Sequence, residues 1–246
     1  MPQGSVLCRI LFNMYVKDIS HFIKNSTVIQ YADDTQFILS GTKDNVQELV
    51  RNCEETLKRV KLYFHTNGLM LNTGKTQCMF VGTRGNLAHI PNNTVIHVDG
   101  SIITPNTSIK NLGIYFDNNM LFDTHASYIS KKCFGTIMLL NRLKENFDKD
   151  TRIILIQSLV LSIINYGLMV WGNTAASHIH QVQKTQNFAA KVALGGNKFD
   201  HVTPYLRELK WLKICDMYKY ELGIIMFDIM IHKLPGWLFS CPRLSK

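Results

Sequence analysis

The fold of this chain is decided by the stretch VIQYADDTQFIL, residues 28–39. Two adjacent carboxylates, Asp33 and Asp34, lie in it between two apolar runs of strand-forming residues. This pattern predicts two antiparallel strands joined by a tight turn, which projects both carboxylates from one end of a sheet. Two close carboxylates resist joint ionisation unless a cation lies between them, and oxygen ligands suit Mg²⁺. The stretch therefore predicts a metal site at a hairpin tip; the alternative is an acidic surface turn.

Length and charge indicate two domains and a polyanionic partner. The chain has 246 residues, of which 46% are hydrophobic, enough to bury one large core or two small ones. Residues 1–117 contain 11 Lys and Arg against 9 Asp and Glu, whereas residues 118–246 contain 16 against 9. We therefore expect one domain at residues 1–117 and a basic domain at residues 118–246. The basic half favours a nucleic-acid partner, although an ordinary soluble surface can carry the same charge.

The cysteine pattern and the longest uncharged stretch indicate an intracellular protein. The six cysteines are scattered, without a Cys-x-x-Cys pair or a zinc-finger spacing, and no signal peptide is recognisable. We therefore expect a protein of the nucleus or cytoplasm that is not secreted. Residues 153–172 contain no charged side chain, but Gln157, Ser158 and Asn165 favour a buried helix over a membrane span. We expect no membrane partner.

Hydrophobic periodicity predicts an α+β fold. Helical spacing covers residues 6–23 and 46–64, and strand patterns flank the Asp-Asp turn and cover residues 77–82. The order helix, strand, strand, helix, strand is that of a split βαβ, ferredoxin-like unit that lacks its first strand. A hairpin at 95–103 and a strand at 111–116 follow. Beyond them the pattern is helical, with helices expected at 123–146, 150–171, 177–194 and 211–231.

Several short motifs lie along the chain in a characteristic order. They are Pro2-Gln3-Gly4-Ser5, Tyr31-Ala32-Asp33-Asp34, residues 67–72 with Lys75-Thr76, and Asn111-Leu112-Gly113. In this order and spacing they resemble a reverse transcriptase, an RNA-directed DNA polymerase, of non-LTR retrotransposons of the jockey and CR1 kind. The resemblance covers nearly the whole chain, because Asn165-Tyr166-Gly167 and Val170-Trp171-Gly172 resemble the helical region that follows the palm.

The resemblance implies a two-metal transfer of a deoxynucleoside triphosphate onto a primer 3′-hydroxyl. Asp33 matches the family's primary ligand for Mg²⁺ or Mn²⁺, and Asp34 matches a secondary one. Tyr31 and Ala32 match residues that lie against the primer end. Lys75 matches a lysine near the incoming triphosphate, where its charge offsets that of the phosphates. The alternative for Lys75 is an exposed strand lysine.

Further motifs match the family's nucleic-acid contacts. Pro2, Gln3 and Gly4 match the nucleotide and template pocket, because glycine lets a polynucleotide approach the backbone; by themselves they are an ordinary helix-entry turn. The resemblance assigns Leu112-Gly113, with Lys110 nearby, to the hairpin that grips the primer. A plain amphipathic hairpin is the alternative there. The basic helices downstream resemble the thumb, which clamps the duplex of RNA template and DNA primer through phosphates. Their basic residues are Lys131, Lys132, Arg142 and Lys144.

One family feature has no counterpart in the sequence. The third catalytic carboxylate of the family lies on the first palm strand, well upstream of Pro-Gln-Gly, whereas only Met1 precedes Pro2 here. We therefore expect a partial palm without its first strand and fingers, followed by a thumb-like helical domain. Such a polymerase fragment is expected to be inactive without the remaining palm and fingers of its parent. The alternatives are a non-catalytic nucleic-acid-binding remnant and an unstable relic of a mobile element.

Overall fold

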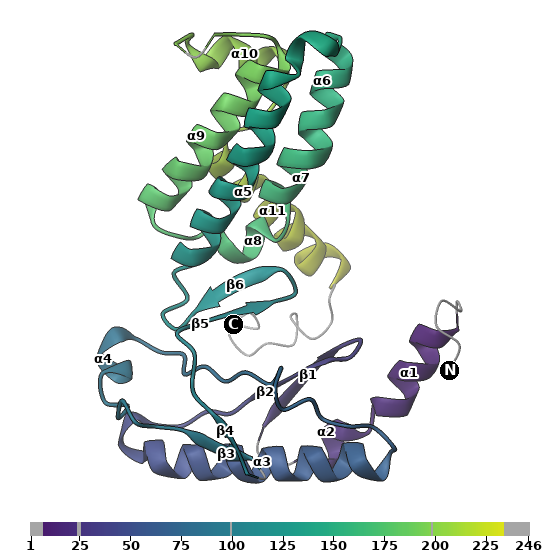
Figure 1. Ribbon diagram of the computed structural model, residues 1–246, viewed down its shortest axis with the longest axis vertical. Helices are drawn as coiled ribbons and strands as arrows, with labels where there is room; N and C mark the ends of the chain where they lie inside the picture. Colours follow the sequence, from purple (N-terminus) through teal and green to yellow (C-terminus); the bar gives the residue numbers. More distant parts are fainter. Residues whose placement is uncertain (1–6, 24–25, 99, 198, 234–246) are drawn as a thin grey trace. The chain divides into compact units, whose positions relative to one another are not determined.

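The computed structural model describes residues 7–23, 26–98, 100–197 and 199–233, which form small antiparallel sheets and many helices (Figure 1). The α+β class is therefore confirmed. The chain divides into two compact units, Met1–Ile109 and Lys110–Lys246. Composition placed the division later, near residue 118. The structure places it inside strand β5, Ser108–Asn111, whose hairpin partner β6, Ile114–Asp117, belongs wholly to the second unit.

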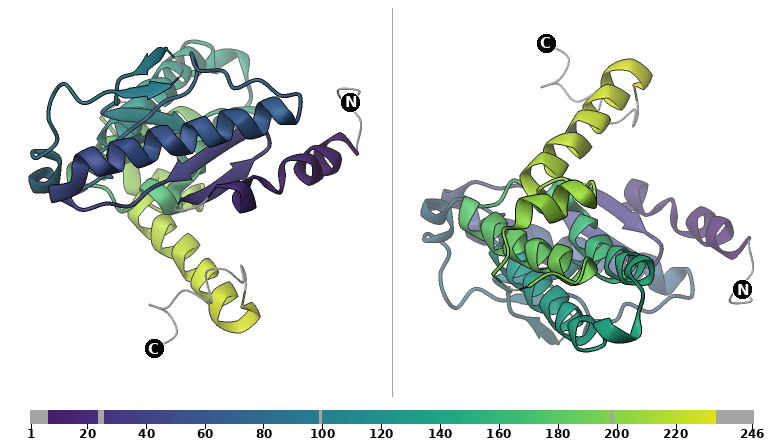
Figure 2. Two further views of the ribbon diagram at one scale, coloured as in Figure 1. Left: turned by 90° about the horizontal axis from the view of Figure 1, so that it is seen from below. Right: turned by 90° about the horizontal axis from the view of Figure 1, so that it is seen from above.

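The first unit is organised around one long helix, α3. This helix packs through one half of its buried face against α2 and the β1–β2 hairpin, and through the other half against the β3–β4 hairpin. Figure 2, left, shows α3 running across both hairpins. The elements of the unit are α1 (Cys8–Val16), α2 (Ile19–Phe22), β1 (Thr27–Tyr31), β2 (Asp34–Ile38), a 3₁₀ turn (Lys43–Asn45), α3 (Val46–Thr66), α4 (Arg84–Leu87), β3 (Ile96–Val98) and β4 (Ser101–Ile103).

The C-terminal end of α3 follows from its glycine. Gly68 has φ +68°, a conformation that costs glycine little, and it takes the first position after the cap. The Leu69 N–H donates to the Phe64 carbonyl at 2.7 Å, and the Gly68 N–H donates to the His65 carbonyl at 3.0 Å. These two bonds form a Schellman motif, which satisfies the last carbonyls of the helix.

Two predictions for the first unit are wrong. The single helix expected at 6–23 is broken at Lys17 and Asp18 into α1 and α2, within the described residues 7–23. The strand expected at 77–82 is irregular, and the described residues form three separate two-stranded sheets instead of one ferredoxin-like sheet. A strand needs a neighbouring strand that forms hydrogen bonds with its backbone N–H and C=O groups. In this segment one backbone bond is made across the unit, from the Asn106 N–H to the Cys78 carbonyl at 2.8 Å.

The second unit is a helical bundle that follows the β5–β6 hairpin (Figure 2, right). Its core lies between α5, α9 and the uncharged stretch 153–172, from which Ile156, Val160, Ile164, Leu168 and Trp171 are fully buried. As expected, this stretch packs into the core of a helical domain, but only through one face, and it is not one helix because it breaks at Tyr166 and Gly167. The helices are α5 (Asp123–Arg142), α6 (Lys149–Ile156), a π-helical segment (Gln157–Leu161), α7 (Ser162–Asn165), α8 (Leu168–Trp171), α9 (Ala176–Ala193), α10 (Val202–Glu208), α11 (Ile214–Phe227) and a final π-helical segment (Asp228–His232).

None of the helices in the described ranges is long and apolar enough to cross a membrane.

Candidate active site

The β1–β2 hairpin forms as predicted. Its strands are antiparallel, with Val28 opposite Phe37 and Tyr31 opposite Asp34. Val28 and Phe37 pack against the cluster that α2 and α3 bury. Because side chains alternate along a strand, Tyr31 and Asp34 lie on the other face, where Tyr31 is 65% exposed. The buried pair therefore fixes the register, and the register presents Asp34 on the open face of the hairpin.

The tip of the hairpin is a two-residue turn, Ala32-Asp33. Ala32 adopts φ +52°, which is unusual for a residue with a Cβ atom. Asp33 and Asp34 are both exposed, so the turn and the first residue of β2 offer two adjacent carboxylates at one end of the hairpin. Among the described residues, no group of three or more His, Cys, Asp or Glu side chains could hold a metal ion. The chemistry of the pair fits a hard cation such as Mg²⁺, which takes oxygen ligands and keeps waters in its other positions.

The backbone of Ala32 provides a test of this turn. We expect Ala32→Gly to raise the unfolding free energy of the chain by about 1 kcal/mol, because glycine adopts positive φ without the steric cost of a side chain. Urea denaturation measures the change. Ala88→Gly is the matched control: Ala88 has φ −65°, and this change should lower stability by about 0.5 to 1 kcal/mol. An equal loss in both variants would contradict the turn geometry.

Lys75 lies in an exposed turn after α3, so it is exposed as the alternative expects but does not lie in a strand. Asn72 organises this turn: its side-chain oxygen accepts from the Lys75 N–H at 3.2 Å, and its carbonyl accepts from the Thr76 hydroxyl at 2.9 Å. The Lys75 side chain itself extends into solvent. In the described part of the chain, no ion pair or hydrogen bond joins it to Asp33 or Asp34.

Pro2, Gln3 and Gly4 lie outside the described residues, so their assignment to a template pocket stays a prediction.

The second unit presents the Leu112-Gly113 turn on the β5–β6 hairpin. Both residues have positive φ, +45° and +87°, as in the type I′ turns that join tightly paired strands. The Tyr166 hydroxyl donates to the Leu112 carbonyl at 2.7 Å. A Cβ atom on Gly113 would lie 3.3 Å from the Tyr166 ring, so glycine lets the ring approach. Tyr166 therefore holds the turn, a role that sequence reasoning did not assign.

Tyr166 is itself fixed by the second half of its motif. The Trp171 indole N–H donates to the Tyr166 carbonyl at 3.1 Å, and Trp171 is fully buried. A Cβ atom on Gly167 would lie 2.4 Å from the end of Ile114 in β6. Tyr166, Gly167 and Trp171, from the two motifs of the helical region, thus dock the hairpin on the helices. Their spacing in the sequence gave no sign of this role.

Two lysines and two tyrosines form a cluster on the second unit. The Lys110 ammonium lies 5.5 Å from the ring centre of Tyr115 and 5.4 Å from that of Tyr128. The Lys132 ammonium lies 5.8 Å from the Tyr128 ring. No carboxylate pairs with either lysine within the described residues. Burial lowers the pKa of the adjacent His125 to about 4, and the charge of Lys110 acts in the same direction.

This lysine–tyrosine cluster concentrates positive charge. Two ammonium groups at one ring repel each other, and an anion between them would relieve the repulsion. Such a surface suits a phosphate of a nucleic-acid backbone. Sequence reasoning identified Lys110 and Lys132 but missed Tyr115 and Tyr128, although Tyr128 and Lys132 are four residues apart on α5 and therefore neighbours on its surface.

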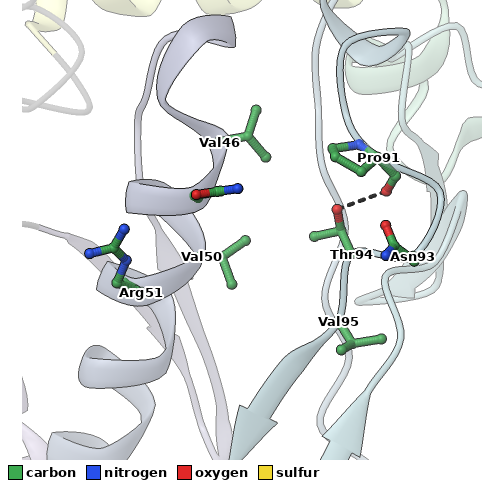
Figure 3. A pocket seen from close by; sticks show the side chains of 8 residues that line it. Val46, Val50, Arg51, Pro91, Asn93, Thr94 and Val95 are labelled. Atoms are coloured by element: carbon green, nitrogen blue, oxygen red, sulfur yellow. Dashed lines mark hydrogen bonds between the residues drawn. The ribbon is translucent and has the colours of Figure 1, made fainter.

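A hollow of about 370 Å³ lies elsewhere on the first unit, between α3 and residues 91–95 (Figure 3). The Thr94 hydroxyl donates to the Pro91 carbonyl at 2.7 Å on one of its walls. The hollow contains no carboxylate, histidine or cysteine, and none of the predicted site residues. Its lining is Val46, Gln47, Val50, Arg51, Pro91, Asn93, Thr94 and Val95. It therefore contributes no group for the predicted chemistry.

Comparison with known proteins shows which family the N-terminal part of the chain resembles. Residues 1–116 match the family model described as reverse transcriptase (RNA-dependent DNA polymerase). Residues 1–116 are therefore similar to reverse transcriptases. The match contains the Asp33-Asp34 hairpin, the Lys75 turn and the Leu112-Gly113 turn.

Several relatives of this chain are named as proteins of mobile elements. It is 26% identical over 204 residues to the probable RNA-directed DNA polymerase from transposon BS of Drosophila melanogaster, a match that covers 78% of this chain and 22% of the relative. It is 22% identical to the RNA-directed DNA polymerase from mobile element jockey of the same fly, over 94% of this chain and 26% of the relative. A retrovirus-related Pol polyprotein from type-1 retrotransposable element R1 of Bradysia coprophila is 26% identical, over 70% of this chain and 17% of the relative.

The resemblance to a non-LTR retrotransposon polymerase is thereby confirmed. The chain spans about a quarter of the length of the jockey and BS relatives. No solved structure matches the chain.

Proposed function

We propose that this chain is the part of a retrotransposon RNA-directed DNA polymerase that carries the second half of the palm's metal site and the thumb. The observation that supports the proposal most is the two-residue turn that presents Asp33 and Asp34 together at the end of the β1–β2 hairpin. The first unit serves as the partial palm, and the helices of the second unit serve as the thumb. The reaction adds a deoxynucleoside triphosphate to the 3′-hydroxyl of a DNA primer on an RNA template.

The carboxylates of the hairpin hold the divalent ions in this proposal. Asp33 is the primary ligand of Mg²⁺ or Mn²⁺, and Asp34 is the secondary one. When bound, the ions activate the primer hydroxyl and offset the charge that develops on the phosphates. Tyr31 and Ala32 lie against the primer end, while Lys75 offsets charge on the triphosphate. Pro2, Gln3 and Gly4 line the template side.

The second unit binds the primer and template duplex. The Leu112-Gly113 turn and Lys110 grip the primer, and the lysine–tyrosine cluster contacts its phosphates. The absence of a paired carboxylate at Lys110 and Lys132, among the described residues, supports this role because the lysine charges stay available to an external anion. Binding through phosphates should weaken steeply as salt rises, because it releases counterions.

Primer extension with a binding assay tests the proposal. Two proteins are assayed. One is the chain alone, and the other, the joined protein, is the chain fused to the polymerase residues that precede the matched region in the jockey relative. We expect the chain alone to bind an RNA–DNA duplex without detectable extension, and the joined protein to extend the primer with Mg²⁺ or Mn²⁺. Binding that does not change between low and high salt would contradict the phosphate contacts.

The lysine–tyrosine cluster also supports a second function, a nucleic-acid-binding remnant without catalysis. This alternative predicts salt-sensitive binding and no extension by the joined protein. Extension that depends on a divalent metal would exclude it.

A further inference from the structure

Two cysteines of the first unit lie side by side. Cys53 is on α3, and Cys78 is in the irregular segment that follows the Lys75 turn. Both half-buried side chains pack against the same buried cluster, which Leu57 of α3 and Ile103 of β4 help to form. A hydrogen bond joins the two thiols. Among the free cysteines of the described residues, Cys53 and Cys78 are the two that pack against the same apolar cluster.

Two hydrogen bonds hold the segments that carry the two thiols. The Asn106 N–H donates to the Cys78 carbonyl at 2.8 Å, which ties the irregular segment to the chain just after β4. The Glu54 carboxylate accepts from the His97 N–H of β3 at 2.8 Å, which ties α3 to the same hairpin next to Cys53. The β3–β4 hairpin and the residues just after it therefore hold the two segments that carry Cys53 and Cys78.

The two thiols differ in acidity. A hydrogen bond from Cys53, with a second from the Met79 N–H, holds the pKa of the Cys78 thiol below its usual value. The same bond to Cys78, together with burial, raises the pKa of Cys53. The thiolate is the nucleophile in cysteine chemistry, so Cys78 is the attacking sulfur and Cys53 is the thiol beside it.

We propose that Cys53 and Cys78 form a peroxide-sensitive dithiol that closes to an intramolecular disulfide. The Cys78 thiolate attacks one oxygen of hydrogen peroxide, the O–O bond breaks, and the hydroxide that leaves takes up a proton to become water. Cys78 is thereby oxidised to a sulfenic acid. The Cys53 sulfur then attacks the Cys78 sulfur, the S–O bond breaks, and the Cys53 proton leaves with the hydroxide as a second water. Two thiols and one peroxide thus give one disulfide and two waters.

The disulfide links α3 to the segment three residues beyond Lys75. A lysine that contacts a triphosphate must be free to adjust to it, so the crosslink restricts the turn that carries Lys75. This consequence for nucleotide use rests on the proposed function of Lys75. The disulfide itself does not, because it depends only on contacts within the first unit.

Mass spectrometry of the whole chain tests the disulfide. The chain is treated with hydrogen peroxide, alkylated, digested and compared with and without a reductant. We expect an intramolecular peptide that joins Cys53 to Cys78, and at least a 10-fold faster loss of free thiol at Cys78 than at the exposed Cys215. With Cys53→Ser, a dimedone adduct on the Cys78 sulfenic acid should replace the crosslink, whereas the control Cys215→Ser should leave the crosslink unchanged.

Oxidation of Cys215 while Cys78 remains fully alkylated would overturn the proposal, and so would a crosslink found only between two chains. The assay contains no nucleic acid or nucleotide. Its failure is therefore distinguishable from failure of the polymerase proposal, which the extension assay reports separately.

Discussion

Asp33→Asn is expected to lower primer extension by the joined polymerase at least about 100-fold, because it removes a ligand of the ions that stabilise the transition state. Asparagine has nearly the shape of aspartate and is common in turns, so the hairpin should keep its geometry. Asp33 is exposed, and within the described residues it makes no hydrogen bond that the change would break. The measurement is the single-turnover extension rate at saturating duplex and nucleotide.

The control for Asp33 is another exposed carboxylate of the first unit. Asp44 lies in the 3₁₀ turn before α3, so Asp44→Asn removes the same charge away from the hairpin tip. We expect this variant to extend the primer at the unchanged rate. Equal rates for Asp33→Asn and the unchanged protein, with equal duplex binding, would refute the assignment of Asp33 as a metal ligand.

Gly172→Ala is expected to lower the unfolding free energy of the chain by about 3 kcal/mol, as overpacking at a buried site does. A Cβ atom at Gly172 would lie 2.5 Å from the Leu168 carbonyl oxygen and 2.5 Å from the Tyr218 ring. The carbonyl belongs to the backbone of α8 and cannot move away alone. Relief of the contact with the Tyr218 ring would have to separate α8 from α11. Urea denaturation monitored by the circular dichroism of the helices measures this loss.

A second glycine provides the matched control. Gly223 lies inside α11, and a Cβ atom there would meet no heavy atom within 4 Å. Gly223→Ala should therefore raise stability by about 0.5 to 1 kcal/mol, the difference in helix propensity. If Gly172→Ala proved as harmless as Gly223→Ala, the close packing of α8 on α11 would be wrong.

The elements that the sequence predicts correctly are those whose cause is local. The β1–β2 hairpin follows from alternating apolar residues around a turn, and Gly68 ends α3 because only its backbone adopts the required φ easily. The strand at 77–82 fails for the opposite reason. Its residues favour a strand, but a strand also needs a partner that local sequence does not reveal.

In the candidate site too, features with a local cause were predicted and features that depend on distant residues were missed. The hairpin that presents Asp33 and Asp34 was predicted because two adjacent carboxylates between runs of strand-forming residues indicate a tight turn. The bond from Tyr166 to the Leu112 carbonyl joins residues 54 positions apart, so no local pattern reports it. Tyr115 was missed because its place beside Lys110 depends on the pairing of β5 with β6.

The Tyr166 contact also determines how the Leu112-Gly113 turn moves. A hairpin tip that is joined to its unit only through its two strands swings freely at its end. Here a phenol from the helical bundle fastens the tip at a second point, so a tilt of the bundle drags the tip along with it. The hairpin and the helices behind it therefore move together, and the bond from the Tyr166 hydroxyl joins them at the tip.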